Sequence, residues 1–330
     1  MALLVTEADL RAVTQSPTEI SAAVDAVEAS VLASHHRGAG QVIFGDLALD
    51  DDAYVKVLGS SAPGAGMSLQ TFPAQANPDF HGDSRVMLLF DAGGALTALL
   101  AGDELNALRT SVPAALGARH LAPRDAQVLG ILGSGYQAVS HALTITAAVP
   151  GLKEVRVWSP TTVNRERFAR EQTQLRGLPV HACSSAQDVV ESADILTATG
   201  RTDAGAQAYA AEWVKPGALL ISMTRSAPPG LDGVARVVVP TKRRPELVAF
   251  GFTGVSVPKP AADPGGSVEL IDVIEGRASA REHRDQIVVW ELANVYLWDL
   301  PIAGWAHAWA VRAGVGLSFA LSAAPRGEDA

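Results

Sequence analysis

Apolar runs of strand length alternate with amphipathic helical stretches through the second half of the chain. Residues 128–132 are apolar and end in a Gly-Ser-Gly turn at 133–135. Small or apolar side chains then recur at helical spacing over residues 138–148, and residues 154–159 and 163–175 repeat the strand and the helix. Further strand-length runs continue the alternation, at residues 180–184, 195–199, 219–223 and 237–239. The pattern predicts an α/β fold of the Rossmann type, with a doubly wound parallel sheet.

The first hundred residues carry a different pattern. Ser16-Pro17-Thr18-Glu19 has the capping residue, the proline and the acidic residue typical of a helix start, and apolar residues follow at helical spacing. Between residues 41 and 100, short apolar runs are separated by turn residues, and Asp91-Ala92-Gly93-Gly94 has the composition of a hairpin turn. We therefore expect an α+β region with a leading helix and a mostly antiparallel sheet. A last helix is expected over residues 301–323.

The Gly-Ser-Gly turn has the chemistry of a dinucleotide site. Gly133 allows the tight turn, Gly135 lets the backbone approach a pyrophosphate, and Ala138 is small enough for close packing of helix on strand. Backbone amides and the helix dipole then favour an anion at the start of the helix. The alternative is a glycine-rich turn in another kind of parallel sheet. Because a second strand and helix pair follows directly, we prefer the nucleotide site.

Arg109 is a candidate anion-binding residue. Thr110 has the side chain of a helix cap, and Pro113 is tolerated in the first turn of a helix that runs to Leu121. Arg109 would then stand just before the helix N-terminus, where its charge and the dipole together favour an anion. The alternative is a surface arginine that pairs with a local carboxylate.

Composition narrows the classes of function. A net charge of −9 argues against nucleic acid as a partner. The single cysteine, Cys183, excludes a disulfide framework and indicates a reducing, cytoplasmic compartment; we interpret it as a small buried apolar residue. No apolar run reaches the roughly 20 residues of a membrane helix. We expect no signal peptide, and no metal site among the histidines.

Four segments resemble the ornithine cyclodeaminase/mu-crystallin family: residues 105–110 (LNALRT), 133–138 (GSGYQA), 193–200 (ADILTATG) and the tail 287–300. In that tail Asn294 stands where the family usually has glycine, and Asp299 keeps the family's aspartate. The resemblance implies a dinucleotide-binding Rossmann domain at residues 122–300. It implies a substrate-binding and dimerisation domain at residues 1–121 and 301–330, and hence a homodimer. It also implies chemistry on amino acids or imines.

The chain departs from the family in the substrate site. Met67 stands where members have a lysine, no arginine is present near residues 45–46, and Ala227 replaces the aspartate of the cyclodeaminases. Of the family's cations for the substrate carboxylate, Arg109 survives. Lys56 lies where members tend to have a methionine, so we interpret positions 56 and 67 as having exchanged side chains in one pocket. An ordinary solvent-facing strand lysine is the alternative, because a shift of one residue reverses the face.

The candidate site follows from the resemblance and the motifs together. We assign Lys56 and Arg109 as catalytic: Lys56 as proton donor or electrostatic partner, and Arg109 as ligand of an anionic substrate group or of the cofactor phosphates. The candidate substrate-binding residues are Met67, Thr71, His81 and Asp299. The candidate cofactor-binding residues are Arg109, Thr110, Gly133, Ser134, Gly135, Tyr136, Gln137, Ser159, Thr161, Thr162, Arg165, Thr199, Met223 and Thr224.

Cofactor preference depends on the end of the second parallel strand. An NAD-specific site usually has an acidic side chain there, and this chain has Ser159. Thr161 and Thr162 can donate hydrogen bonds to a 2′-phosphate, and Arg165 or Arg167 can supply positive charge. We therefore expect NADP in preference to NAD. The alternative is that these residues only start the next helix, with Thr162 as its cap.

We expect an NAD(P)H-dependent oxidoreductase that acts on C=N or C–N bonds of a small imine, keto or amino acid-like substrate. It would be an imine or ketimine reductase, or an amino acid dehydrogenase in reverse. One alternative is a non-catalytic protein of mu-crystallin type that holds a cofactor and a small molecule, which the loss of the lysine and the aspartate favours. The other is an amino acid cyclodeaminase, against which Ala227 counts because no acid remains there to manage protons on the departing amine.

Overall fold

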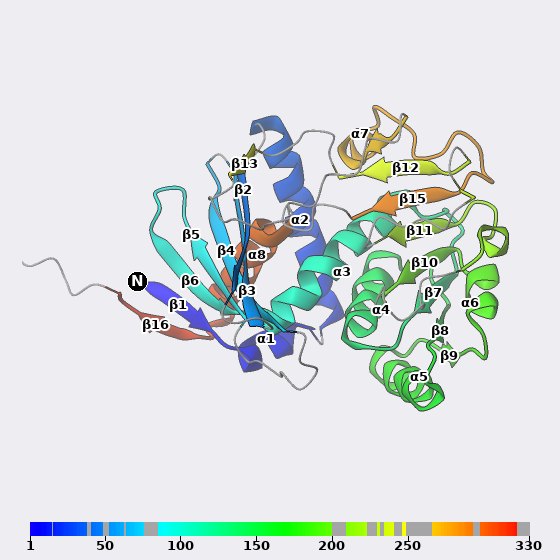
Figure 1. Ribbon diagram of the computed structural model, residues 1–330, viewed down its shortest axis with the longest axis horizontal. Coiled ribbons are helices and arrows are strands. Elements are labelled where there is room, and N and C mark those ends of the chain that lie inside the picture. The colour runs from blue at the N-terminus through cyan, green and yellow to red at the C-terminus, as the bar shows by residue number, and fades with distance from the viewer. Residues whose placement is uncertain are drawn as a thin grey trace, which may run out of the picture.

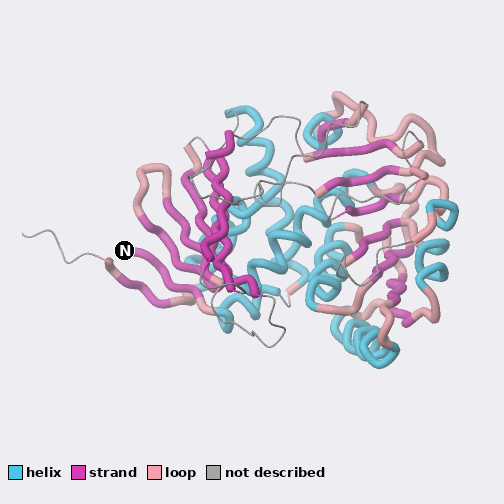
Figure 2. Tube along the Cα trace, viewed as in Figure 1, coloured by secondary structure: helices cyan, strands magenta, loops and turns pink. Residues whose placement is uncertain are grey.

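The computed structural model describes residues 1–14, 16–37, 41–48, 53–62, 64–75, 85–199, 209–222, 230–231, 234–240, 246–248, 266–292 and 298–321. Within these residues the chain forms two eight-stranded sheets. The sheets lie side by side with helices between them (Figures 1 and 2).

The second sheet is parallel throughout and confirms the predicted Rossmann-type fold. Its strands, in spatial order, are β14 (Val268–Glu269), β12 (Arg236–Val239), β15 (Val288–Glu291), β11 (Leu219–Ser222), β10 (Ile195–Ala198), β7 (Val128–Leu132), β8 (Glu154–Trp158) and β9 (Val180–Ala182). The order reverses at β7, which lies between β10 and β8. A ligand of such a sheet binds at this reversal, at the carboxyl ends of the strands.

The first sheet is mostly antiparallel, as predicted. Its strands, in spatial order, are β13 (Glu246–Val248), β2 (Gln41–Ala48), β3 (Ala53–Ala62), β4 (Gly66–Gln75), β5 (Val86–Phe90), β6 (Leu96–Ala101), β1 (Ala2–Val5) and β16 (Leu317–Phe319). Neighbours from β2 to β6 are antiparallel, whereas β13 pairs with β2 and β1 pairs with β6 in parallel. Strand β13 thus joins the first sheet from within the predicted dinucleotide-binding segment, and the division into domains stays a prediction.

The helices occupy the space between the sheets and the outer face of the parallel sheet (Figure 1). Their bounds are α1 (Glu7–Thr14), α2 (Pro17–Arg37), α3 (Gly102–Leu121), α4 (Tyr136–Ala148), α5 (Thr162–Arg176), α6 (Ala186–Ser192), α7 (Leu270–Ile274) and α8 (Asp299–Ala313). A short 3₁₀ turn, η2, spans Ala211–Trp213. Helices α2, α3 and α4 lie centrally, and α8 packs on the first sheet (Figures 1 and 2).

A close contact fixes α3 against the parallel sheet. The side chain of Trp290, in β15, is fully buried, and its Nε1 donates to the carbonyl oxygen of Pro113 at 3.1 Å. A Cβ built on Gly117 would lie 2.4 Å from the Trp290 ring, so a larger residue there would displace the ring. The rigid seating of α3 matters because this helix carries Arg109.

The last helix is shorter than predicted. It ends at Ala313, because Gly314 takes a left-handed conformation with φ of 66° and terminates the hydrogen-bond ladder. The chain then forms β16, which pairs antiparallel with β1. The apolar spacing beyond residue 313 therefore belongs to a strand and not to a helix.

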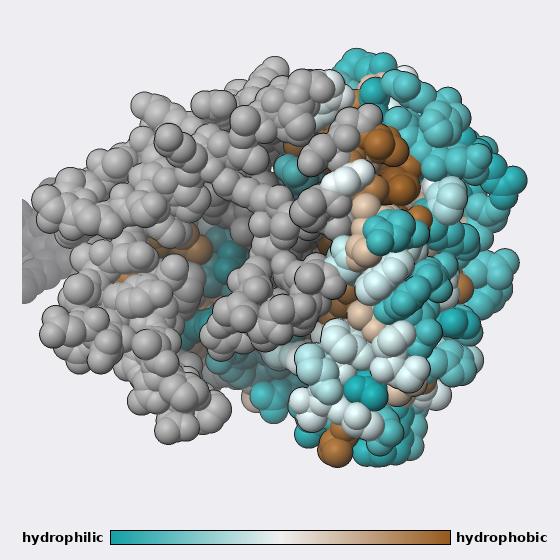
Figure 3. Space-filling model, turned by 45° about the vertical axis from the view of Figure 1, so that its right-hand side comes forward, coloured by the Kyte–Doolittle hydropathy of each residue, from teal (hydrophilic) through white to brown (hydrophobic). Residues whose placement is uncertain are grey.

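The surface over the parallel sheet is mostly hydrophilic, with apolar residues exposed in small groups (Figure 3). In the described part of the chain no helix combines the length and the apolar character needed to span a membrane.

Candidate functional site

The glycine turn lies at the carboxyl end of β7, as the sequence predicts. Gly133 has a φ of 124°, a conformation that a larger residue rarely adopts, and its amide donates to the carbonyl of Trp158 at 2.8 Å. Gly135 is the N-cap of α4, and because it has no side chain it does not cap the first amides of the helix. A Cβ on Gly135 would meet no atom within 4 Å. The turn is therefore open in front of the uncapped helix amides, which fits a dinucleotide pyrophosphate.

Hydroxyl groups from neighbouring strand ends gather around this turn. Ser134 Oγ lies 2.8 Å from Oγ of the buried Ser159, at the end of β8. Thr199, at the end of β10, donates its amide to the carbonyl of Leu132 at 2.8 Å. The structure thus brings together three of the predicted cofactor residues, which follow different strands of the sheet.

The start of α5 follows Ser159. Thr161 is the N-cap of this helix and makes no side-chain capping bond, so the alternative that made Thr162 the cap is wrong. Arg165 folds back over the strand end, and its Nη1 donates to the carbonyl of Ser159 at 2.9 Å. Arg167 is exposed. Arg165 therefore places a positive charge beside the end of β8.

Arg109 lies inside α3 and not before its N-terminus, so the predicted helix start was wrong. The helix begins at Gly102 because the backbone amides of Asp103 and Glu104 donate hydrogen bonds to the carboxylate of Glu7, in α1, at 2.7 and 3.0 Å. This distant cap replaces the local cap that Thr110 was expected to provide. Because Arg109 sits in the helix interior, the N-terminal amides of α3 contribute nothing directly to an anion beside it.

The Arg109 side chain is held by two partners. Its Nε donates to Oδ1 of Asn106, one turn earlier in α3, at 2.9 Å. Its Nη1 lies 3.4 Å from Oδ1 of Asp299, the first residue of α8. Both charged residues are buried, at 8% and 2% exposure. Among the described residues Nη2 of Arg109 forms no hydrogen bond.

Burial also perturbs Asp299. It raises the pKa of this carboxyl to about 6, against the opposing charge and hydrogen bond of Arg109. The predicted substrate-binding aspartate is therefore one member of a buried ion pair that titrates close to neutrality. A carboxylate does pair with Arg109, but it lies 190 residues away in the sequence and the pair is buried between α3 and α8. The alternative of a surface arginine paired with a local carboxylate is therefore wrong.

A hydroxyl–amide contact joins the ion pair to the glycine turn. Thr110 Oγ1 lies 2.5 Å from Oε1 of Gln137, in the first turn of α4, and 2.9 Å from the carbonyl of Ala107. The predicted residues Thr110 and Gln137 thus connect the helix that carries Arg109 to the helix that starts at the turn. Tyr136 points elsewhere: its hydroxyl donates to the carbonyl of Asp103, so its side chain extends toward the start of α3.

The strand residues of the candidate substrate pocket lie on the first sheet. Met67 and Thr71 are partly buried and, four residues apart in β4, share one face. Lys56 pairs with Phe72, whereas Met67 pairs with Ser61. Five residues separate Phe72 from Met67, so the register assigns positions 56 and 67 to opposite faces. The proposed exchange of side chains within one pocket wall is therefore wrong.

Several candidate residues lie outside the described residues. These are His81, Met223 and Thr224 from the candidate site, with Ala227 and Asn294 from the comparison with the family. The side chain of Lys56 is likewise not described, although its backbone lies in β3. The roles assigned to these residues stay predictions.

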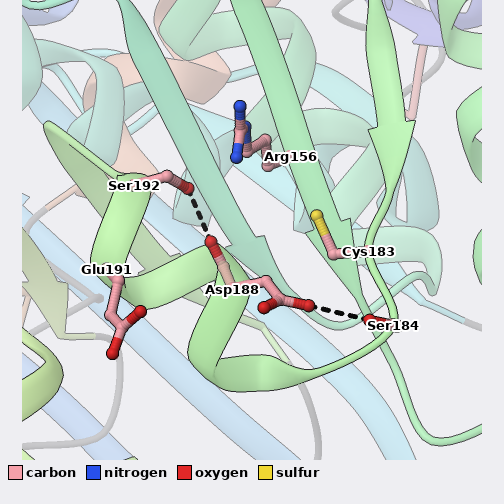
Figure 4. A pocket seen from close by; sticks show the side chains of 6 residues that line it. All are labelled: Arg156, Cys183, Ser184, Asp188, Glu191 and Ser192. Atoms are coloured by element: carbon pink, nitrogen blue, oxygen red, sulfur yellow. Dashed lines mark hydrogen bonds between the residues drawn. The ribbon is translucent and has the colours of Figure 1, made fainter.

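A hollow of about 500 Å³ opens beside β8, β9 and α6, near the edge of the parallel sheet (Figure 4). Cys183 borders it and is half-buried, not fully buried as predicted, and burial raises the pKa of its thiol. Asp188 accepts a hydrogen bond from Ser184 Oγ at 2.8 Å and closes the start of α6 in a capping box. Arg156 is paired with Glu154 at 2.7 Å. Arg156 is the single cation among the lining residues and already has a carboxylate partner, while Asp188 and Glu191 add negative charge, so the hollow does not favour a phosphate.

Two residues with a part in the site escaped the sequence reasoning. Asn106 accepts a hydrogen bond from Arg109 and so orients its side chain. In a helix that begins at Gly102, the spacing of three residues between them predicts this contact. Glu7 caps α3 from 96 residues away, and no local signal marks it.

A search against protein-family models matches residues 65–312 to the ornithine cyclodeaminase/mu-crystallin family. The ketimine reductase mu-crystallin of Rattus norvegicus is 40% identical over 144 residues, which are 43% of this chain and 44% of that protein. The chain thus matches less than half of the length of that relative. A Delta(1)-pyrroline-2-carboxylate reductase of Bacillus thuringiensis subsp. konkukian (strain 97-27) is 27% identical over 241 residues, which are 70% of this chain and 72% of that protein.

Solved structures agree with the fold over almost the whole chain. The Delta(1)-pyrroline-2-carboxylate reductase of Thermococcus litoralis, in complex with NADH and L-proline, has a TM-score of 0.75 at 21% identity and covers 96% of this chain and 100% of that one. The iminosuccinate reductase of Paracoccus denitrificans, in complex with NAD⁺, has a TM-score of 0.73 at 23% identity and covers 96% and 98%. These likenesses show the shared fold. With the family match across most of its length, the chain belongs to the ornithine cyclodeaminase/mu-crystallin family.

Proposed function

We propose that this protein is an NAD(P)H-dependent reductase of C=N bonds in small imine or ketimine substrates. The observation that carries the proposal is the buried Arg109–Asp299 pair, joined through Thr110 and Gln137 to an open glycine turn. The relatives named as ketimine reductase and pyrroline-2-carboxylate reductase support the reaction class. Amino acid dehydrogenation is the same chemistry in reverse.

Each group has a role in this proposal. A bound reduced nicotinamide supplies the hydride. The residues of the glycine turn hold the pyrophosphate through backbone amides, and Ser134 and Ser159 line the strand ends beside it. Arg109 donates from Nη2 to an anionic group of the substrate, and Asn106 and Asp299 fix the direction of the guanidinium.

The substrate pocket is atypical because Met67 stands where family members have a lysine. Lys56 remains our candidate for the group that protonates or stabilises the iminium, acting from a position in β3 that the register assigns to the face opposite to Met67. Lys56→Met is therefore expected to lower turnover by on the order of 10²-fold or more, as for loss of an acid–base group, with little change in cofactor affinity. Near-normal turnover would remove Lys56 from the mechanism.

The test of the function is oxidation of NADPH or NADH, followed by absorbance, with cyclic imine carboxylates such as Δ1-pyrroline-2-carboxylate. We expect saturable turnover that Arg109→Met reduces strongly. Arg170→Met, a change at an exposed arginine of α5, is the matched control. Binding of dinucleotide without any turnover across a panel of cyclic and linear imines would contradict the proposal.

The second candidate is a non-catalytic protein that holds a dinucleotide and a small molecule. The observation that favours it is Met67, an apolar side chain in place of the family's lysine. The same assay separates the two functions. A cyclodeaminase activity has less support, because Ala227 replaces the aspartate of that group.

We further propose a cofactor preference, an oligomeric state, a division into domains and a compartment. NADP is preferred to NAD, since Ser159 directly follows β8 and Arg165 lies over it. The protein is a homodimer, as the resemblance implies. Residues 1–121 and 301–330 form the substrate-binding and dimerisation domain, and residues 122–300 form the dinucleotide-binding domain. The compartment is the cytoplasm, since the one cysteine is unpaired.

A further inference from the structure

A second hollow, of about 530 Å³, lies where α1, α3 and α4 meet the end of α5. Its floor is apolar and closed, because Leu108, Leu143 and Leu152 are at most 7% exposed. Its volume and its apolar lining are those of pockets that take small molecules. It runs alongside α4, whereas the glycine turn stands at the N-terminal end of that helix. The hollow shares Tyr136 with the candidate cofactor-binding residues, but the hydroxyl of Tyr136 is directed to the carbonyl of Asp103 and away from the glycine turn.

Exposed apolar side chains gather at the rim of this hollow. Tyr136, Val139 and Leu175 are 49%, 38% and 67% exposed, and all three line it. Single exposed apolar residues are ordinary, but three around one concave surface indicate a place where something apolar binds.

Arg176 gives the hollow its charge. The side chain crosses from α5 to α4, where Nη2 donates to the carbonyl of Val139 at 3.1 Å and Nε donates to Gln172 at 3.0 Å. Both acceptors are neutral, and no carboxylate among the described residues forms an ion pair with Arg176. Nη1 also makes no hydrogen bond within the described part of the chain. Burial lowers the pKa of this guanidinium to about 10, the sign of a desolvated and uncompensated cation.

The acid among the residues that line the hollow, Glu104, already has a cationic partner. Glu104 forms an ion pair with Arg11 at 3.5 Å. The hollow therefore combines an apolar floor with one cation that has no counter-ion, and an occupant that completes it carries an apolar body and one negative group.

We propose that this hollow is a second ligand site, which binds an apolar carboxylate with its hydrocarbon part on the floor and its carboxylate on Arg176. A medium-chain aliphatic acid has this chemistry. The ligand would contact α3, the helix that carries Arg109, and α4, the helix that follows the glycine turn.

The test is isothermal titration of the full chain with decanoate below its micellar concentration, and with decylamine as the probe of equal length and opposite charge. We expect one decanoate per chain and no saturable binding of decylamine. Arg176→Gln should weaken decanoate at least tenfold, which is about 1.4 kcal/mol. Arg170→Gln, at an exposed arginine of the same helix that does not line the hollow, should bind as the wild type does.

A second variant tests the location independently of the charge. Ala147 lines the hollow and is partly buried, so Ala147→Phe should fill the space and abolish binding while the circular dichroism spectrum stays that of the wild type. The proposal is overturned if the wild type shows no saturable binding of decanoate, if decylamine binds equally, or if either variant binds decanoate as the wild type does. Because the titration contains no dinucleotide and measures no turnover, its outcome is independent of the proposed reductase activity.

Discussion

Substitution of Asp299 by asparagine tests the centre of the candidate site. Asp299 Oδ1 lies 3.4 Å from Nη1 of Arg109, and the residue is 2% exposed. Burial raises its pKa from 3.8 to about 6. An asparagine keeps an oxygen that can accept the hydrogen bond from Arg109, but its side chain does not titrate. The substitution therefore removes the titration and retains most of the geometry.

The expected effect on activity follows from the ionised fraction. If the Asp299 carboxylate orients Arg109, kcat/KM of the wild type rises with pH through about 6. One unit below the pKa about a tenth of the carboxyl groups are ionised, so kcat/KM at about pH 5 should be roughly tenfold below its plateau. The Asp299→Asn enzyme should show no such change between about pH 5 and pH 7.

Stability gives a second readout with a defined sign. The pKa of Asp299 is higher in the folded chain than the value of 3.8 expected in the unfolded chain. Between these two pKa values the folded state binds more protons, so the free energy of unfolding falls as pH rises. A shift of about two units corresponds to a loss of at most about 3 kcal/mol. Urea denaturation on either side of this window measures it, and Asp299→Asn should lack this contribution.

Glu171→Gln is the matched control for both readouts, since Glu171 is an exposed acid of α5. It should reproduce the wild-type pH profile of kcat/KM and of stability. An Asp299→Asn enzyme that kept the wild-type rise in kcat/KM near pH 6 would refute the orienting role of Asp299.

Three further predictions concern the cofactor site and α3. Gly133→Asp should abolish dinucleotide binding in isothermal titration, because its φ of 124° disfavours a side chain and the added carboxylate would repel a pyrophosphate; unchanged affinity would remove the basis of the cofactor assignment. Glu7→Ala should lower the free energy of unfolding in urea by about 1–2 kcal/mol, the usual cost of a lost helix cap, and Glu7→Gln, which keeps one acceptor, should lose less; no loss in either would mean that the distant cap is dispensable. The wild type should prefer NADPH to NADH in kcat/KM, and an Arg165→Ala, Arg167→Ala double variant should reduce the preference; equal efficiency with both cofactors in the wild type would contradict it.

The parallel sheet and its glycine turn were predictable from the sequence because their signals are local. Apolar runs, turn glycines and helical spacing lie within a few residues of each other, and the strand, turn and helix they predict at residues 128–148 are those observed. The requirement for Gly133 is equally local, since its positive φ belongs to the turn itself. The mostly antiparallel character of the first sheet was likewise visible in its short apolar runs and its turns.

The arrangement around Arg109 was decided only by the tertiary structure. The carboxylate that caps the start of α3 belongs to Glu7, which lies 96 residues before Asp103, the residue whose amide donates to it. The ion-pair partner of Arg109 is Asp299, which lies 190 residues after Arg109. The facing of Lys56 and Met67 depended on strand register, which a shift of one residue reverses. A local pattern reports what a segment forms by itself, whereas a distant cap, a buried ion pair and a sheet register exist only after the chain has folded. The cap and the ion pair determined the surroundings of Arg109, and the register determined the faces of positions 56 and 67.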